Sequence, residues 1–188
     1  NDFLQYLYRP SVSQQYALSL SGGSRQAAYL LSAGWDHNNL NLKGNAYQRL
    51  TLRSENTFKP LPKLELQAGL VLTQSHQTRN SPGGFGELIP GGGKNRLYPY
   101  AQLADEAGNP LALEKDYRGT FTDTAGAGYL LDWKYRPLEE RQHLDVSTRL
   151  QDWVLKGGVR YQFTPALKAE LGYQYQQCNA TDRTYHCL

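Results

Sequence analysis

The sequence predicts an all-β protein in which antiparallel hairpins form part of a large transmembrane β-barrel with a long outer loop. Three observations support this prediction. Apolar and polar residues alternate along several stretches, as they do on strands with one apolar and one wet face. The longest of these stretches, at 46–58, 63–77 and 143–163, run for about 12 to 20 residues, whereas strands of soluble sandwiches usually have about 5 or 6. Short turns alternate with long connections, which is typical of outer-membrane barrels.

The first predicted hairpin combines residues 15–23 and 25–35. Tyr16 and Leu18 alternate with small or polar neighbours in the first of these stretches. The Gly-rich sequence "GGS" at 22–24 separates the two stretches, and a short Gly-containing connection between alternating segments is a hairpin signal.

The second predicted hairpin combines residues 47–58 and 63–74, with a proline-containing turn, "KPLP", at 59–62. The second stretch has the most regular alternation in the chain. Its apolar positions are Leu64, Leu66, Ala68, Leu70 and Leu72, and its polar positions between them include Glu65, Gln67 and Thr73. We therefore expect a strand with two chemically distinct faces here.

The third predicted hairpin joins a long strand at 143–163 to a strand at 167–176 through "TPA" at 164–166. In the long strand the apolar positions change parity between Leu150 and Trp153. An extra residue in one strand of a pair would produce such a change, so we expect a β-bulge at this point.

Two longer connections separate the hairpins, at 36–46 and 78–142. Structureless connections as long as the second are uncommon in compact soluble domains. In outer-membrane barrels, periplasmic turns are short and outer loops are long. We therefore expect the three short turns at the periplasmic end and both longer connections at the outer end.

The alternation assigns side chains to two environments. In a membrane barrel, one set points outward into lipid: Leu64, Leu66, Leu70, Leu72, Leu171 and Tyr173. The other set points into the lumen or against a plug: Glu65, Gln67, Lys168 and Glu170. In a two-sheet soluble sandwich the polar set would simply be the solvated outer face. Strand length favours the barrel over the sandwich.

Composition excludes several classes of protein. The 20 basic and 17 acidic residues are spread along the chain without the clustered basic stripe that nucleic-acid binding usually needs. The longest apolar runs, "AAYLL" at 27–31 and "AGLVL" at 68–72, are far shorter than the roughly 20 residues of a transmembrane helix. Because the chain contains no Met, we expect an internal piece or a processed product.

No motif in the sequence predicts catalysis, a metal site or a cofactor, so we expect a protein that is not an enzyme. "GELIPGGGKN" at 86–95 has Leu88 where a phosphate-binding loop needs its first Gly. No Gly-x-Ser-x-Gly elbow is present. The histidines lack the spacing that a zinc site favours; they are His37, His76, His143 and His186.

Two cysteines, Cys178 and Cys187, lie close together in a polar stretch near the end of the sequence. Outside the cytosol two such thiols would tend to pair, and a turn near "NATDR" at 179–183 would bring them into range. A disulfide is therefore a candidate, with unpaired thiols or partners elsewhere as the alternatives.

Aromatic residues are dense in the long connection. They include Phe85, Tyr98, Tyr100, Tyr117, Phe121, Tyr129, Trp133 and Tyr135. Exposed rings stack on sugars and pack against peptides. The candidate substrate-binding residues are Phe85, Tyr98, Tyr100, Tyr117, Phe121 and Trp133. The alternative is that the loop folds on itself or on a partner and buries these rings.

Several short motifs follow one another along the chain: "LSLSGGS" at 18–24, "GW" at 34–35, "KG" at 43–44 and "YQRLTLR" at 47–53. In this order they resemble the SusC-like TonB-dependent receptors of Bacteroidetes. The family's strand ending in "LSVSGGS" corresponds to Leu18 to Ser24, and a glycine with an aromatic corresponds to Gly34 and Trp35. The family's "KG" loop and "Y-x-R-x-x-L-R" strand correspond to Lys43, Gly44, Tyr47, Arg49, Leu52 and Arg53. "YPYAQLADEAGNPLAL" at 98–113 resembles the family's long outer loop. Nearly all of the chain is covered.

This resemblance implies a nutrient importer of the cell outer membrane, with a barrel of about 22 strands and a plug. Residues 1–13 would join the plug to the barrel, and residues 14–188 would form early barrel strands and outer loops. The implied partners are membrane lipid, a SusD-like surface lipoprotein, TonB through the missing plug, and an oligosaccharide or peptide substrate. The alternative is a soluble β-sandwich that binds carbohydrate through its loop aromatics.

Overall fold

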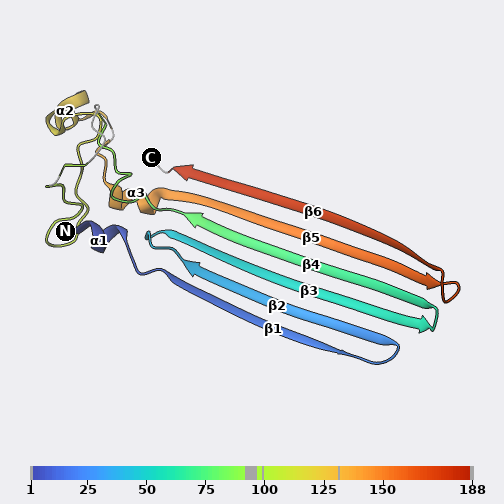
Figure 1. The fold of residues 1–188 in the computed structure, drawn as a ribbon. Coiled ribbons are helices and arrows are strands. Elements are labelled where there is room, and N and C mark those ends of the chain that lie inside the picture. The colour runs from blue at the N-terminus through green and yellow to red at the C-terminus, as the bar shows by residue number, and fades with distance from the viewer. Residues whose placement is uncertain (1, 92–96, 99, 131, 187–188) are drawn as a thin grey trace.

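The computed structural model describes residues 2–91, 97–98, 100–130 and 132–186. Its strands are long and its helices are short (Figure 1). In chain order the elements are α1 (Asp2–Leu7), β1 (Val12–Gly23), β2 (Ala27–Asn39), β3 (Asn45–Leu61), β4 (Leu64–Arg79), α2 (Gly119–Thr124), the 3-10 helix η1 (Ala125–Gly128), α3 (Pro137–His143), β5 (Leu144–Gln162) and β6 (Lys168–His186).

The strands form one antiparallel sheet of six, in the order β1-β2-β3-β4-β5-β6. The three predicted hairpins are confirmed. Figure 1 shows the three short turns together at one end of the sheet, and the helices and the long connection at the other. The predicted grouping of turns and loops is therefore correct. The sheet is open, since no hydrogen-bonded ladder joins β1 to β6 among the described residues.

The strands extend further toward the loop end than the alternation predicted. β2 continues to Asn39 and β3 begins at Asn45, so the predicted connection at 36–46 shrinks to 40–44. Gly44 ends this connection with a backbone φ of 95°, in the left-handed region that favours glycine. A Cβ at this position would lie 2.9 Å from the backbone of Asn80. The sequence predicted a longer connection because the apolar alternation stops at polar residues there. The backbone hydrogen bonds of the ladder do not depend on side-chain polarity, so the strands continue.

The predicted bulge between Leu150 and Trp153 is wrong. β5 keeps an uninterrupted register with both neighbours there, and Trp153 lies directly opposite Leu72. The register shift in the sheet lies instead between Phe58 and Leu61 in β3. The apolar positions of β5 change parity near Leu150 because the apolar face of the sheet carries polar residues toward its loop end.

The predicted turn at 179–183 is also wrong, because these residues continue β6 opposite β5. Cys178 lies on that strand, opposite Asp152. Cys187 lies outside the described residues, so its pairing with Cys178 stays a prediction.

The sheet has one apolar and one charged face. Directly opposite residues of antiparallel strands share a face, so the register assigns every paired strand residue to one side. The apolar face carries the predicted outward set, including Leu70 and Leu171, and the charged face carries Glu65 and Glu170 of the predicted inward set. Large apolar side chains on the apolar face remain open; Leu18 is 76% exposed and Leu171 75%.

The buried core lies outside the sheet, in the long connection and α1. Its members are Phe3, Leu7, Leu88, Leu97, Ala101, Leu103, Ala104, Leu113 and Leu138. α1 therefore packs with residues far along the chain, and the long connection has a folded core of its own. We call α1 and residues 80–143 together the loop region.

Candidate functional site

The loop region is tied to the end of the sheet by residues that follow α1. The Phe85 N–H donates a hydrogen bond to Tyr8 Oη (3.1 Å). The guanidinium of Arg9 donates to the carbonyl oxygens of Leu40 (3.0 Å) and Asn45 (2.7 Å), in and beside the β2–β3 connection. Hydrogen bonds from one charged group to two carbonyls restrict the orientation of both segments. The loop region is thus held in a defined position against the sheet.

Three of the predicted binding residues meet in the loop region and form an aromatic cluster: Tyr117, Phe121 and Trp133. The ring centroid of Tyr117 lies 5.4 Å from both Phe121 and Trp133, and those two are 6.0 Å apart. The helix α2 carries Phe121, and Trp133 Nε1 donates to the Thr122 carbonyl (3.3 Å). The three rings are 44–54% exposed, so the loop does not bury them.

A hollow of about 660 Å³ lies beside this cluster. Rings of Tyr98, Tyr117, Trp133 and Tyr135 line it together with charged groups of both signs, namely Glu114, Lys115, Asp123 and Lys134. Lys115 Nζ lies 4.3 Å from the ring centroid of Tyr135, a cation–π contact. Aromatic walls with opposite charges near them can hold an extended ligand that carries both apolar and charged groups.

Electrostatic contacts order the chain that follows the cluster. A hydrogen bond from Arg136 (2.8 Å) lowers the pKa of Asp132 below its usual range. The same contact raises the pKa of Arg136. Burial raises the pKa of Tyr135. Lys134 pairs with Asp123 of α2, which links the segment carrying Trp133 to the helix carrying Phe121.

The structure does not bring all the predicted residues together. Phe85 packs edge-on against Phe3, with ring centroids 4.9 Å apart, away from the cluster. Tyr100 is 88% exposed and does not line the hollow. Tyr135, Lys115 and Glu114 line it but were not predicted as site residues. The alternating charges of 114–118 were the only sequence signal for the last two.

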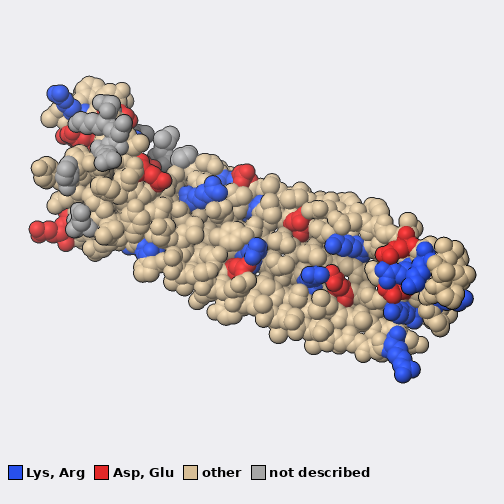
Figure 2. Space-filling view, in the orientation of Figure 1, with Lys and Arg blue, Asp and Glu red and all other residues tan. Residues whose placement is uncertain are grey.

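The charged face of the sheet carries ion pairs along its length, and Figure 2 shows red and blue groups adjoining across it. Asp36 pairs with Arg49 (2.7 Å) on neighbouring strands. Nearer the short turns, Arg160 lies 3.0 Å from Glu170 and 3.4 Å from Glu65. Charges on this face therefore balance one another locally.

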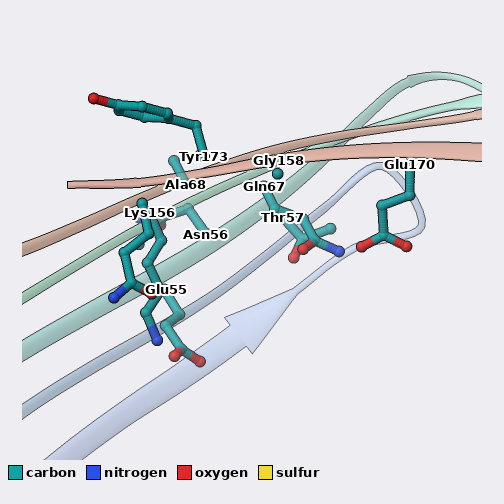
Figure 3. A pocket seen from close by; sticks show the side chains of 13 residues that line it. Glu55, Asn56, Thr57, Gln67, Ala68, Lys156, Gly158, Glu170 and Tyr173 are labelled. Atoms are coloured by element: carbon teal, nitrogen blue, oxygen red, sulfur yellow. The ribbon is translucent and has the colours of Figure 1, made fainter.

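A second hollow, of about 530 Å³, interrupts the charged face. Its floor has glycines on three neighbouring strands, Gly69, Gly158 and Gly172, where side chains are missing. Figure 3 shows Lys156, Glu55 and Glu170 pointing to the charged side and Tyr173 to the opposite side. The hollow can thus receive a chain segment against the sheet.

In the described part of the chain, no group of three or more His, Cys, Asp and Glu residues is placed to hold a metal ion. None of the described helices is long and apolar enough to cross a membrane.

No protein-family model matches the chain, and no curated protein sequence matches it significantly. Solved structures do match. The RagAB peptide importer in its closed-closed state aligns with 95% of this chain at a TM-score of 0.65 and 16% identity. Its open-open state aligns over 95% with a TM-score of 0.65 and 17% identity, and a further structure of the RagAB peptide transporter aligns over 96% with a TM-score of 0.62 and 17% identity. The chain has the fold of a section of this importer.

The chain spans 19% of the length of each of these importer chains. The predicted fold, antiparallel hairpins that form part of a barrel, is confirmed. In the described residues the six strands form a single sheet with exposed apolar leucines, not the two packed sheets of a sandwich.

Proposed function

We propose that this chain is part of the barrel wall of a SusC-type importer of the outer membrane. The observation that carries the proposal is the segregation of charge across the sheet. From the positions opposite Leu64 to those opposite Gln74, every paired Asp, Glu, Lys and Arg of the six strands is on one face, and Lys59, in the register shift of β3, contacts Glu65 of that face. A soluble sheet has no reason to keep an uncovered face free of charge over this length, whereas lipid requires it.

The extent of the uncharged band matches a bilayer. It covers ten residue steps along β4, or about 33 Å of strand at roughly 3.3 Å per residue. For strands tilted by about 40° this gives a height of about 25 Å, the usual height of the apolar band of outer-membrane barrels.

The aromatic residues at the loop-side edge of the uncharged band give the tilt of the strands by a second route. Successive register partners connect Trp35 on β2 to Asn179 on β6, whereas the aromatic residue of β6 nearest to Asn179 on this face is Tyr175. The edge of the band thus shifts by four residues, about 13 Å, across four strands spaced about 4.8 Å apart. The resulting angle of about 35° lies within the range of barrel strands.

The charged face then faces the interior of the barrel. The hollow floored by Gly69, Gly158 and Gly172 supports contact with a plug that occupies the lumen, through which TonB would act. In this arrangement the loop region is on the outer side, where a SusD-like lipoprotein would cover it.

We propose peptides as the substrate class, with oligosaccharides as the second candidate. The aromatic cluster offers rings to either ligand, but the hollow beside it also has carboxylates and ammonium groups at close range. These complement the charged ends and side chains of peptides. The solved importers that share this fold are peptide importers.

Binding measurements on the complete protein test this assignment. Truncation of Trp133 to Ala is expected to weaken binding of peptides about two- to twelvefold, since a stacked ring contributes roughly 0.5 to 1.5 kcal/mol. The matched control is Tyr129→Ala, because Tyr129 is 95% exposed and lies outside the cluster. Equal losses for the two variants, or binding of oligosaccharides in place of peptides, would contradict the proposal.

A further inference from the structure

One register row on the apolar face differs from all the others in its chemistry. Its members lie directly opposite one another on the six strands and are Gln14, His37, Gln48, His76, Arg149 and Thr181. We call this the polar row. Every member can donate a hydrogen bond, and none is acidic. It lies two residues beyond Trp35 toward the loop end.

Along the apolar face from the uncharged band toward the loop end, Arg149 is the first residue with a full positive charge. It is exposed and has no carboxylate within 4.0 Å among the described residues. By contrast, Arg49 and Arg160 on the charged face are each ion-paired at 3.0 Å or less. An arginine without a carboxylate partner leaves a planar set of donors available to an external anion.

The histidines of the polar row also have unused hydrogen-bonding capacity. The Nδ1 atoms of His37 and His76 are buried, and neither has a hydrogen-bond partner in the described part of the chain. The ring of His37 stacks on Trp35, with centroids 5.6 Å apart. This contact holds the His37 ring beside the aromatic edge of the uncharged band. The row therefore combines an unpaired cation with imidazoles and amides on one face of the sheet.

We propose that the polar row binds the phosphate groups of lipid headgroups in the leaflet on the loop side. The proposal rests on the membrane placement proposed above. The row begins about 7 Å along the strand from Trp35, and Arg149 lies about 13 Å from Trp153 on β5. Aromatic girdles mark the boundary of the hydrocarbon, so side chains at these distances lie at the level of the headgroups.

The test measures binding of lipid A that carries two phosphates to the complete protein in detergent, by native mass spectrometry, with dephosphorylated lipid A in parallel. Arg149→Gln is expected to weaken binding of the phosphorylated lipid about fivefold, the factor for one cation near an anionic surface. Binding of the dephosphorylated lipid is expected to be unchanged. The control is Arg79→Gln, which removes the same charge at the same end of the sheet but on the charged face.

Arg149→Lys keeps the positive charge and is expected to retain most of the binding, which also separates loss of charge from loss of folding. Equal weakening by Arg149→Gln and Arg79→Gln would overturn the proposal, as would equal loss of both lipids. Displacement of the lipid by 10 mM inorganic phosphate would identify a site for free anions and would also overturn it. The membrane placement itself is tested separately by spin labels on β4, so its failure can be distinguished.

Discussion

Substitution of Leu70 by Arg tests whether the apolar face contacts lipid. Leu70 lies on β4 opposite Ser54 and Leu155, and its register row continues to Leu20 and Tyr175 without a charge. It is six residues, or about 20 Å of strand, from the turn-end limit of the band at Leu64, and therefore near the middle.

A charge at the midplane of a barrel's lipid face costs about 2 to 4 kcal/mol, so L70R is expected to lower the free energy of unfolding by this amount. The matched control is Thr73→Arg on the same strand. Thr73 is on the charged face, directly opposite Asp152, so its new charge gains a cross-strand partner. Such pairs contribute about 0.2 to 1 kcal/mol, and T73R is expected to be neutral or slightly stabilising.

The assay is reversible unfolding of the complete protein from lipid vesicles in guanidinium chloride, monitored by tryptophan fluorescence. Both variants place the same residue on the same strand, three positions apart. Equal stability of L70R and T73R, or greater loss in T73R, would refute the assignment of the two faces.

Three further predictions concern the loop end and β6. Removal of the Arg9 guanidinium in Arg9→Ala is expected to increase amide exchange at 40–45 measured by mass spectrometry, since Arg9 holds the Leu40 and Asn45 carbonyls; unchanged exchange would show that the backbone contacts alone suffice. The contact with Arg136 lowers the pKa of Asp132, so its contribution to stability is present above about pH 4 and is lost as the pH falls further. Limited proteolysis near 132–136 should therefore accelerate more in acid for the wild type than for Asp132→Asn, and identical acceleration would contradict the prediction. A non-reducing digest tests the candidate disulfide between Cys178 and Cys187: residues 178–186 continue β6 over about 26 Å of strand, so a linked peptide is expected only if this end of β6 leaves the sheet, and alkylation of both thiols without reduction would exclude the disulfide.

The strands were predictable because their alternation is local. A side chain lies on the apolar or the charged face according to its position in the strand, so residues such as Leu64 to Leu72 identify both the strand and its faces. The same rule gave the wrong prediction of a β-bulge between Leu150 and Trp153. There the pattern changed because the apolar face of the sheet carries polar residues toward the loop end, and a sequence alone cannot distinguish this from a bulge.

The loop region could be predicted only in composition. Its aromatic residues were recognisable, but the meeting of Tyr117 with Trp133 depends on α2 and on the Lys134–Asp123 pair. The packing of Phe3 against Phe85 joins segments about 80 residues apart. Periodicity carries no information on contacts between residues so far apart in the sequence. The structure was therefore needed to show which of the six candidate residues lie together.

Spin labels placed singly at each position from 64 to 75 of β4, in a background with Cys178 and Cys187 replaced by Ser, test the central claim most directly. Collision rates with oxygen, which concentrates in lipid, and with a water-soluble nickel chelate are measured on the complete protein in vesicles. We predict that oxygen access alternates with period two, is high at even positions and is greatest near 70, with nickel access strongest at odd positions. No alternation, or a label at 70 that neither reagent reaches, would contradict a lipid-facing sheet.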